Sequence, residues 1–211
     1  MAVVGKPSAS SGTMVAVAVD GALEPISQLV ALEGLPGPHR EEQPFAKPHF
    51  IPFDPSGQWV LVPDKSVDRV FVFRCAEGRL TPAAQPFVQA REGAGPRHLV
   101  FHPTQPWVYV INELDSTVTA YRFDVATGAL QRFQVISALA ENYTGNSRAS
   151  EIEVNRTGCR FFTSTPGGKT ASRCSASTQI PGALFCYRQL AGLERPRASL
   201  SPTPLVIGFT C

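Results

Sequence analysis

An internal repeat constrains the fold of this chain more than any other feature. The stretch FDPSGQWVLVPDKSVDRVFVFR begins at Phe53, and FHPTQPWVYVINELDSTVTAYRF begins at Phe101, an offset of 101 − 53 = 48 residues. In both copies an aromatic residue and a proline precede an apolar run that starts with Trp, then a polar turn and a second apolar run. Because β-branched and aromatic residues dominate these runs, we expect strands at 59–62, 69–73, 107–111 and 117–123.

The period of the repeat favours a β-propeller. Gly-x-Leu turns recur at Gly21, Gly78 and Gly128 and divide the chain into units of four extended segments. Such units are typical of propeller blades, which stack because a single sheet cannot bury both of its faces. Units at 49–96 and 97–150, with half a blade before them and a strand start after them, give about three blades. The predicted fold is all-β: a partial propeller, open as an arc, with an irregular C-terminal tail.

Composition and charge narrow the function classes. The chain has 211 residues, of which 43% are hydrophobic and 17% charged, and a formal net charge of +2. Its Lys and Arg residues are scattered, so we expect neither a nucleic acid nor a membrane as partner. The sequence has no apolar run near the roughly 20 residues of a membrane span and no signal-peptide core, which predicts a cytoplasmic protein. Its five cysteines form no CxxC pair and no His/Cys metal spacing, so we expect neither a zinc site nor a disulfide framework. We also expect no other metal and no cofactor.

Four motifs together identify a family. HFIPFDPSGQWVLVPD, GPRHLVFHP, VYVINELDSTV and ASEIEV resemble the seven-bladed lactonase family, which contains 6-phosphogluconolactonases and carboxy-muconate cyclases. The resemblance implies hydrolysis or formation of a lactone ring in a central channel, without a metal. It also implies a site made of His49, Arg97 and Glu113. The family usually has a His-x-His pair at the first position, but here the first member is Lys47, so this pair is only half kept.

The three residue types suit lactone chemistry. Ring opening needs a base to activate water, a cation to hold the developing oxyanion, and an acid for the leaving alkoxide. His49 has a suitable intrinsic pKa, Arg97 supplies a bidentate fork, and Glu113 can orient a partner or exchange a proton. Purely structural roles are the alternative: His49 in the core, Arg97 closing a turn, and Glu113 solvated in the NELDS turn. His102 stands where the first copy has Asp54, so we interpret it as a turn residue.

The sequence changes character after residue 158. From Cys159 onward the alternating pattern stops, and Ser, Thr, Pro, Arg and Cys dominate. A disordered tail is one interpretation. A shift of reading frame is a sharper one, because codons displaced by one base can encode LYVNTRGEDSIAVFSIDPDTG, with the strands and turns of a next blade and a further family Arg. We therefore expect a disordered segment at 1–11, a partial lactonase-type propeller at 12–158, and an out-of-frame, disordered tail at 159–211. We also expect that N-terminal sequence is missing.

Three functions stay open at this point. The resemblance favours a fragment of an enzyme that hydrolyses a small sugar lactone such as 6-phosphogluconolactone. A carboxy-muconate-type lactonising cyclase shares the same three positions. A catalytically dead interaction propeller is favoured by Lys47 and by the missing blades. We expect this chain to be inactive even though its parent family is enzymatic. Family membership alone is an analogy, since propellers host many functions. The oligomeric state stays open.

Overall fold

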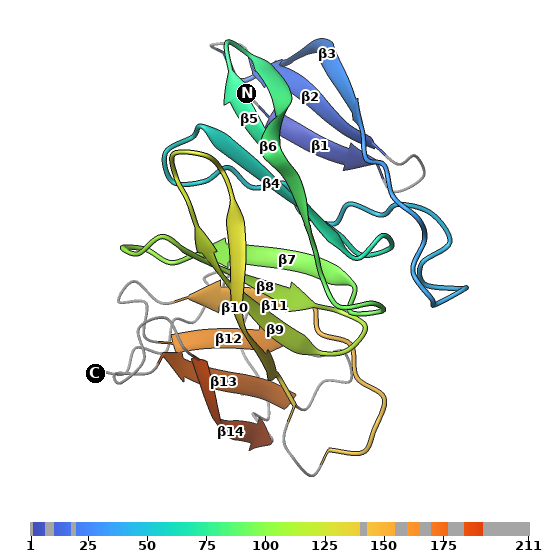
Figure 1. The fold of residues 1–211 in the computed structure, drawn as a ribbon, viewed down its shortest axis with the longest axis vertical. Coiled ribbons are helices and arrows are strands. Elements are labelled where there is room, and N and C mark those ends of the chain that lie inside the picture. Colours follow the sequence, from blue (N-terminus) through green and yellow to red (C-terminus); the bar gives the residue numbers. More distant parts are fainter. Residues whose placement is uncertain are drawn as a thin grey trace, which may run out of the picture.

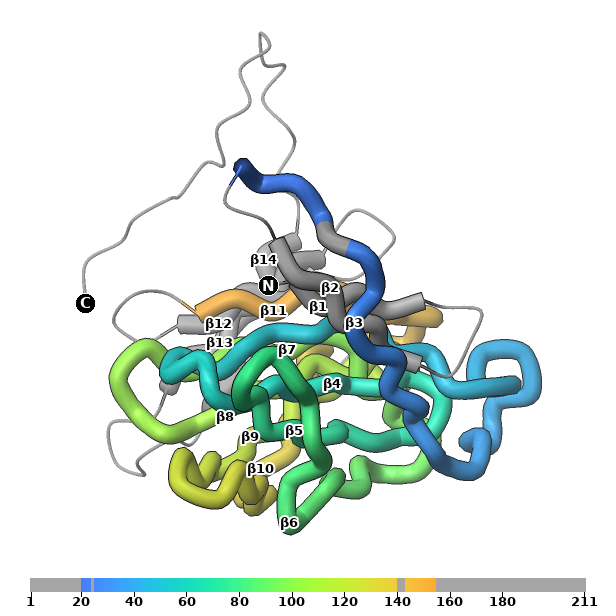
Figure 2. The backbone as a smooth tube through the Cα atoms, turned by 90° about the horizontal axis from the view of Figure 1, so that it is seen from above, coloured from blue at the N-terminus to red at the C-terminus, as the bar shows by residue number. Residues whose placement is uncertain are grey.

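The computed structural model describes the backbone of residues 2–6, 11–17, 20–139, 143–154, 160–164, 170–176 and 184–191, and the side chains of 20–23, 25–139 and 143–154. Every regular element in these ranges is a β-strand, which confirms the all-β prediction. The strands form four antiparallel sheets that follow one another from top to bottom in Figure 1. Viewed along this stacking direction, strands of successive sheets overlap (Figure 2).

Each sheet is built from strands that are consecutive in the chain. The first contains β1 (Ala2–Lys6), β2 (Ser11–Val17) and β3 (Leu23–Ala31). The second contains β4 (Trp59–Asp64), β5 (Arg69–Ala76) and β6 (Arg79–Gln89). The third contains β7 (Pro96–Phe101), β8 (Trp107–Asn112), β9 (Thr117–Phe123) and β10 (Leu130–Ser137). The fourth contains β11 (Glu151–Val154), β12 (Arg160–Ser164), β13 (Thr170–Ala176) and β14 (Leu184–Ala191).

In the second sheet, single bridges stand in place of a complete innermost strand. Pro48 pairs with Asp64, and Phe53 pairs with Val60. Pro52 has no backbone N–H to donate, and it stands where β7 of the next sheet has Val100 (100 − 52 = 48), which pairs with Tyr109. The His49 N–H still donates to the Pro63 carbonyl at 3.1 Å. The backbone therefore fixes His49 beside β4 even though the strand is irregular.

The turns repeat together with the strands. Asp68 and Ser116, 116 − 68 = 48 residues apart, both have φ of 51° in the turn after the first apolar run. The Asp54 carboxylate accepts from the backbone N–H groups of Ser56 and Trp59. His102 Nδ1 accepts from the N–H groups of Thr104 and Gln105 at 3.2 and 3.1 Å in the equivalent turn. The interpretation of His102 as a turn residue is therefore confirmed.

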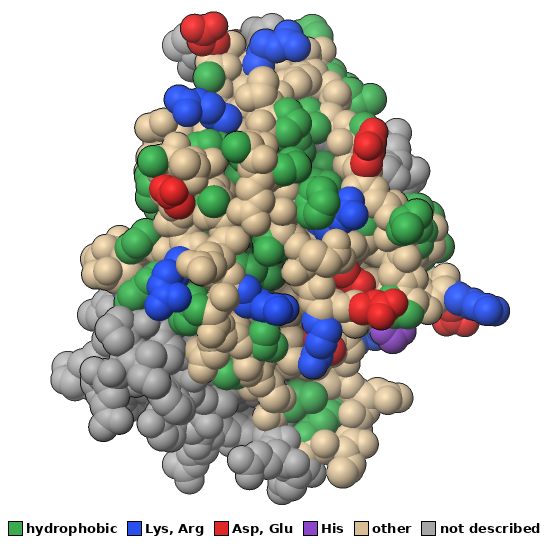
Figure 3. Space-filling model, in the orientation of Figure 1, with side chains coloured by type: hydrophobic (Ala, Val, Ile, Leu, Met, Phe, Trp, Pro, Cys, Tyr) green, Lys and Arg blue, Asp and Glu red, His purple; other side chains and the backbone are tan. Residues whose placement is uncertain are grey.

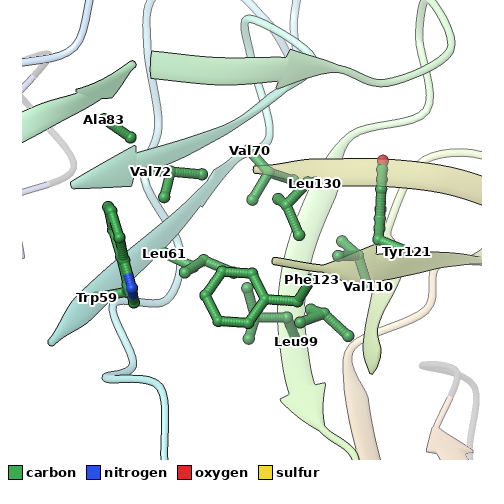
Figure 4. Packing of buried hydrophobic residues seen from close by; sticks show 11 residues of the cluster. Trp59, Leu61, Val70, Val72, Ala83, Leu99, Val110, Tyr121, Phe123 and Leu130 are labelled. Atoms are coloured by element: carbon green, nitrogen blue, oxygen red, sulfur yellow. The ribbon is translucent and has the colours of Figure 1, made fainter. Parts of the chain in front are cut away.

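Burial on both faces explains why the strands read as continuous apolar runs. In β4, Trp59 and Leu61 pack towards the third sheet, whereas Val60 and Val62 pack towards the first. Successive side chains of a strand point to opposite faces, and here both faces are covered by a neighbouring sheet. Figure 4 shows the first of these cores, where Trp59 and Leu61 face Phe123 and Leu99. Each large apolar side chain buried in this way contributes roughly 1.5–3 kcal/mol.

The third and fourth sheets share a further core. Tyr109, Ile111 and Val118 from the third sheet pack with Ala149 and Ile152. The packing of four sheets in series is the architecture expected for consecutive propeller blades, and it includes one sheet more than the three that the repeat predicted.

Apolar side chains remain on the surface at the N-terminal end of the stack. Green surface is prominent over the upper half of Figure 3, where Figure 1 places β1–β6. Leu23, Ile26 and Leu29, all on β3, are each about two-thirds exposed. This is the exposed end face that an open arc of blades predicts, since no further sheet among the described residues covers it.

Two sequence predictions concern the ends of the chain. Within 1–11 the structure has β1 and the start of β2, and within 159–211 it has β12, β13 and β14. The other residues of these segments lie outside the described ranges, as do all side chains of 155–211. The shifted reading frame therefore stays a prediction. In the described part of the chain, no helix is long and apolar enough to cross a membrane.

Candidate active site

The three residues named from the sequence lie together. Arg97 Nη1 donates to Glu113 Oε2 at 2.5 Å and approaches His49 Nε2 at 3.4 Å. His49 Nε2 lies 3.8 Å from the same Glu113 oxygen. His49 lies beside β4 of the second sheet, whereas Arg97 is in β7 and Glu113 follows β8 of the third sheet. The fold thus brings a base, a cation and a carboxylate to one point.

The repeat explains how this point is built. His49 and Arg97 are 97 − 49 = 48 residues apart, and each begins the innermost segment of its blade. Lys65 and Glu113 are also 113 − 65 = 48 residues apart, and each directly follows the strand that begins with Trp, β4 and β8 respectively. Equivalent positions of stacked blades lie side by side, so two repeat positions in two blades supply four side chains of this cluster.

Backbone and side-chain hydrogen bonds fix the Glu113 carboxylate. The Glu113 N–H donates to the Gly95 carbonyl at 2.7 Å, and its carbonyl accepts from the Ala149 N–H at 3.2 Å. Lys65 Nζ donates to Oε1 at 2.9 Å while Arg97 holds Oε2. Burial raises the pKa of Glu113, but the hydrogen bonds from Lys65 and Arg97 outweigh burial and lower this pKa below its ordinary value. Glu113 is therefore an oriented, ionised carboxylate at neutral pH.

His49 is neutral at neutral pH. Burial, and after it the positive charge of Arg97, lower the pKa of His49 to about 4, although Glu113 opposes the shift. A neutral imidazole can accept the Arg97 hydrogen bond at Nε2, which a protonated ring cannot. With 30% of its side chain exposed, His49 can reach a water molecule. It therefore has the protonation state of a general base.

Three further charged residues complete the cluster, and sequence reasoning did not name them. Lys65, whose side chain is 8% exposed, also donates to Glu42 Oε2 at 2.8 Å. Arg148 Nη2 lies 2.8 Å from the other Glu42 oxygen, and its Nη1 lies 3.6 Å from Glu113 Oε1. The 48-residue offset could have identified Lys65 as the counterpart of Glu113. Glu42 and Arg148 lie in irregular segments with no pattern that would single them out.

The cluster carries a surplus of positive charge. Three cations, Lys65, Arg97 and Arg148, face two carboxylates, Glu42 and Glu113, while His49 is neutral. Cationic groups with unused N–H donors favour an anionic ligand or a developing negative charge. In the described part of the chain, no three His, Cys, Asp or Glu side chains lie close enough to hold a metal ion. The prediction of a site without a metal or a cofactor stays a prediction.

Lys47, which replaces the first histidine of the family's His-x-His pair, contacts residues other than His49. Lys47 Nζ donates to the Glu42 carbonyl at 2.9 Å and lies 5.2 Å from the centre of the Phe45 ring. The contacts described for Lys47 do not include His49. His98, the residue after Arg97, stacks on Phe50 and lies 3.0 Å from Glu151 through Nδ1. Lys47 and His98 thus lie at the edge of the cluster rather than in it.

Comparison with known proteins decides the family. The family described as "Lactonase, 7-bladed beta-propeller" matches residues 3–172, which is most of the chain. The chain belongs to this lactonase family. The resemblance seen in the sequence and the partial-propeller fold are therefore confirmed.

Curated relatives in the lactonase family are about one third identical to this chain over the stretch that matches. It is 33% identical to the 6-phosphogluconolactonase of Bacillus subtilis over 150 residues, which are 70% of this chain and 41% of the relative. It is 34% identical to the 6-phosphogluconolactonase of Pectobacterium carotovorum over 157 residues, 72% of this chain and 43% of the relative. The chain thus spans about two fifths of the length of these curated relatives.

Solved structures agree with the lactonase fold. A protein from Lactobacillus plantarum superposes with a TM-score of 0.78 at 26% identity, over 86% of this chain and 51% of that one. A periplasmic gluconolactonase from Pseudomonas aeruginosa superposes with a TM-score of 0.76 at 25% identity, over 86% of this chain and 50% of that one.

Proposed function

We propose that the cluster around Glu113 is a lactone-hydrolysing site, with His49, Arg97 and Glu113 as its catalytic residues. The observation that carries the proposal is their convergence: Arg97 contacts both of the other side chains, at 2.5 and 3.4 Å. Membership of the lactonase family supports this reaction class, and the names of the curated relatives support lactone hydrolysis. Because the chain spans only part of those relatives, the activity of the whole protein belongs to the same proposal.

The proposed mechanism follows from the protonation states. When the substrate carbonyl oxygen replaces His49 as the acceptor of the Arg97 N–H, the Nε2 lone pair of neutral His49 is released; it accepts a proton from water, and the resulting hydroxide attacks the lactone carbonyl carbon. The carbonyl oxygen gains negative charge, which the Arg97 guanidinium stabilises. The ring C–O bond then breaks, and the imidazolium of His49 returns its proton to the leaving alkoxide. Glu113 keeps Arg97 oriented and favours the transient imidazolium 3.8 Å away.

The substrate in this proposal is a sugar lactone such as 6-phosphogluconolactone. The name is taken from the curated relatives, and the positive surplus of the cluster is consistent with an anionic group on the substrate. We place the protein in the cytoplasm as part of the same proposal, although one structural relative is described as periplasmic. A lactonising cyclase would use the same three residues in reverse, and no described contact favours it over hydrolysis.

Acid release from 6-phosphogluconolactone tests the proposal. The sequence alone led us to expect an inactive chain, but all three residues assemble within the described blades, so we expect a rate above that of buffer. We expect His49→Gln to return this rate to that of buffer. Arg91→Gln is the control, since Arg91 is 61% exposed and pairs with Asp115 away from the cluster. A folded wild-type chain with no rate above buffer would assign it to the non-catalytic interaction propellers instead.

A further inference from the structure

The three cations of the cluster differ in their number of close partners and in their exposure to solvent. Arg97 is bound at both ends of its guanidinium, by Glu113 at Nη1 and by the Ser150 carbonyl at Nε. Lys65 is buried between two carboxylates. Arg148 is 45% exposed and has one close partner, Glu42, whose side chain is 31% exposed. Arg148 is therefore the cation of the cluster that can change partners.

If Arg148 leaves Glu42, the Glu42 carboxylate still has a positively charged partner, Lys65. Its Oε2 accepts from Lys65 Nζ at 2.8 Å, and this hydrogen bond is the main reason why the pKa of Glu42 is lowered. Arg148 meets the other oxygen, Oε1. A half-exposed ion pair of this kind is weak because both partners can return to water. A phosphate dianion offers a guanidinium more charge and a bidentate geometry than a carboxylate that is already shared with a lysine.

We propose that Arg148 recognises a phosphate monoester on the substrate, and that Glu42 holds Arg148 at the rim of the site until this group replaces the carboxylate. The inference rests on the proposed function, because the phosphate that Arg148 binds belongs to the same lactone substrate that the catalytic residues hydrolyse. Arg148 Nη1 lies 3.6 Å from Glu113 Oε1, so a group bound by Arg148 is adjacent to the catalytic residues. Arg148 thus determines specificity for phosphorylated over unphosphorylated sugar acids and lactones.

The test compares two ligands of the full chain by isothermal titration calorimetry: 6-phosphogluconate and gluconate. The wild type should bind the phosphorylated acid more tightly, and Arg148→Gln should reduce the ratio of the two affinities by about 10- to 100-fold. Glu42→Gln should increase this ratio several-fold, because Arg148 is then no longer held by a carboxylate. Arg148→Lys should retain part of the preference, since a lysine keeps the charge but not the fork.

The control is Arg91→Gln, which removes an exposed arginine from its ion pair with Asp115, a residue that is not part of the cluster, and should leave the ratio at the wild-type value. Circular dichroism verifies that every variant is folded. A wild-type chain without preference, or a ratio that is the same in Arg148→Gln, overturns the inference. If the chain nevertheless hydrolyses lactones in a His49-dependent way, the proposed function stands alone. A chain that neither hydrolyses the lactone nor binds either acid overturns both.

Discussion

Replacing Lys65 with methionine tests how much the charged cluster contributes to stability. Lys65 and Glu113 have side chains only 8% and 9% exposed, and their charged atoms are 2.9 Å apart. Removing one partner of a buried ion pair typically costs about 3–5 kcal/mol, because the other charge is left without compensation. Arg97 remains on Glu113 Oε2, so we expect the lower end, about 3 kcal/mol. At roughly 2–4 °C per kcal/mol for a chain of this length, the melting temperature should fall by about 6–12 °C.

Chemical denaturation of four proteins measures this effect: wild type, Lys65→Met, Glu113→Gln and the double variant. If the cost arises from the orphaned carboxylate, the double variant should be more stable than the sum of the single losses predicts, by at least about 1.5 kcal/mol. Arg91→Met, in the exposed pair with Asp115, should cost less than about 1 kcal/mol. A loss below about 1 kcal/mol for Lys65→Met, or strict additivity in the double variant, would refute the reasoning.

Three further predictions concern packing, pH and the coding sequence. Gly128→Ala should destabilise by about 3 kcal/mol in denaturant melts, because φ is +76° and a Cβ would lie 2.5 Å from the Trp59 ring; Gly57→Ala, at φ +71° with open space, should cost about 1 kcal/mol. In the folded chain the pKa of His49 is about 4, below its value of 6.5 in the unfolded chain. The contribution of His49 to stability should therefore be fully present above pH 6.5 and should fall by on the order of 2 kcal/mol as the pH falls to 4. His49→Gln should remove this pH dependence. Sequencing of genomic DNA and transcript across codons 155–170 should find one base more or fewer than the present reading; identical sequences would disprove the frame shift.

The fold was predictable because the 48-residue repeat of the sequence reappears in the strands and in the turns of the structure. The apolar runs predicted at 59–62 and 107–111 are strands that each extend a little further, to Asp64 and to Asn112. Their continuous hydrophobicity follows from burial on two faces, which stacking of the blades provides. Even the exchange of Asp54 for His102 could be interpreted, since both side chains accept backbone N–H groups in the same turn.

The site was only partly predictable. His49, Arg97 and Glu113 could be named because family motifs surround them, and their convergence was implied by the propeller. Lys65 was missed although the repeat offset relates it to Glu113, because a lysine and a glutamate at equivalent positions have opposite charges and do not look alike as residue types. Glu42 and Arg148 reach the cluster from irregular segments, where neither periodicity nor motif gives the direction of a side chain. Only tertiary structure shows that they meet.

The most direct test of the assembled site is the titration of His49 by NMR, with its imidazole signals assigned through their loss in His49→Gln. Burial and the nearby Arg97 guanidinium are the main reasons for a pKa of about 4, and Arg97→Gln should raise it, because the nearest positive charge is removed. This measurement does not depend on catalytic turnover. A His49 that titrates near 6.5 and does not respond to Arg97→Gln would contradict the account, since it would mean that the two side chains do not meet.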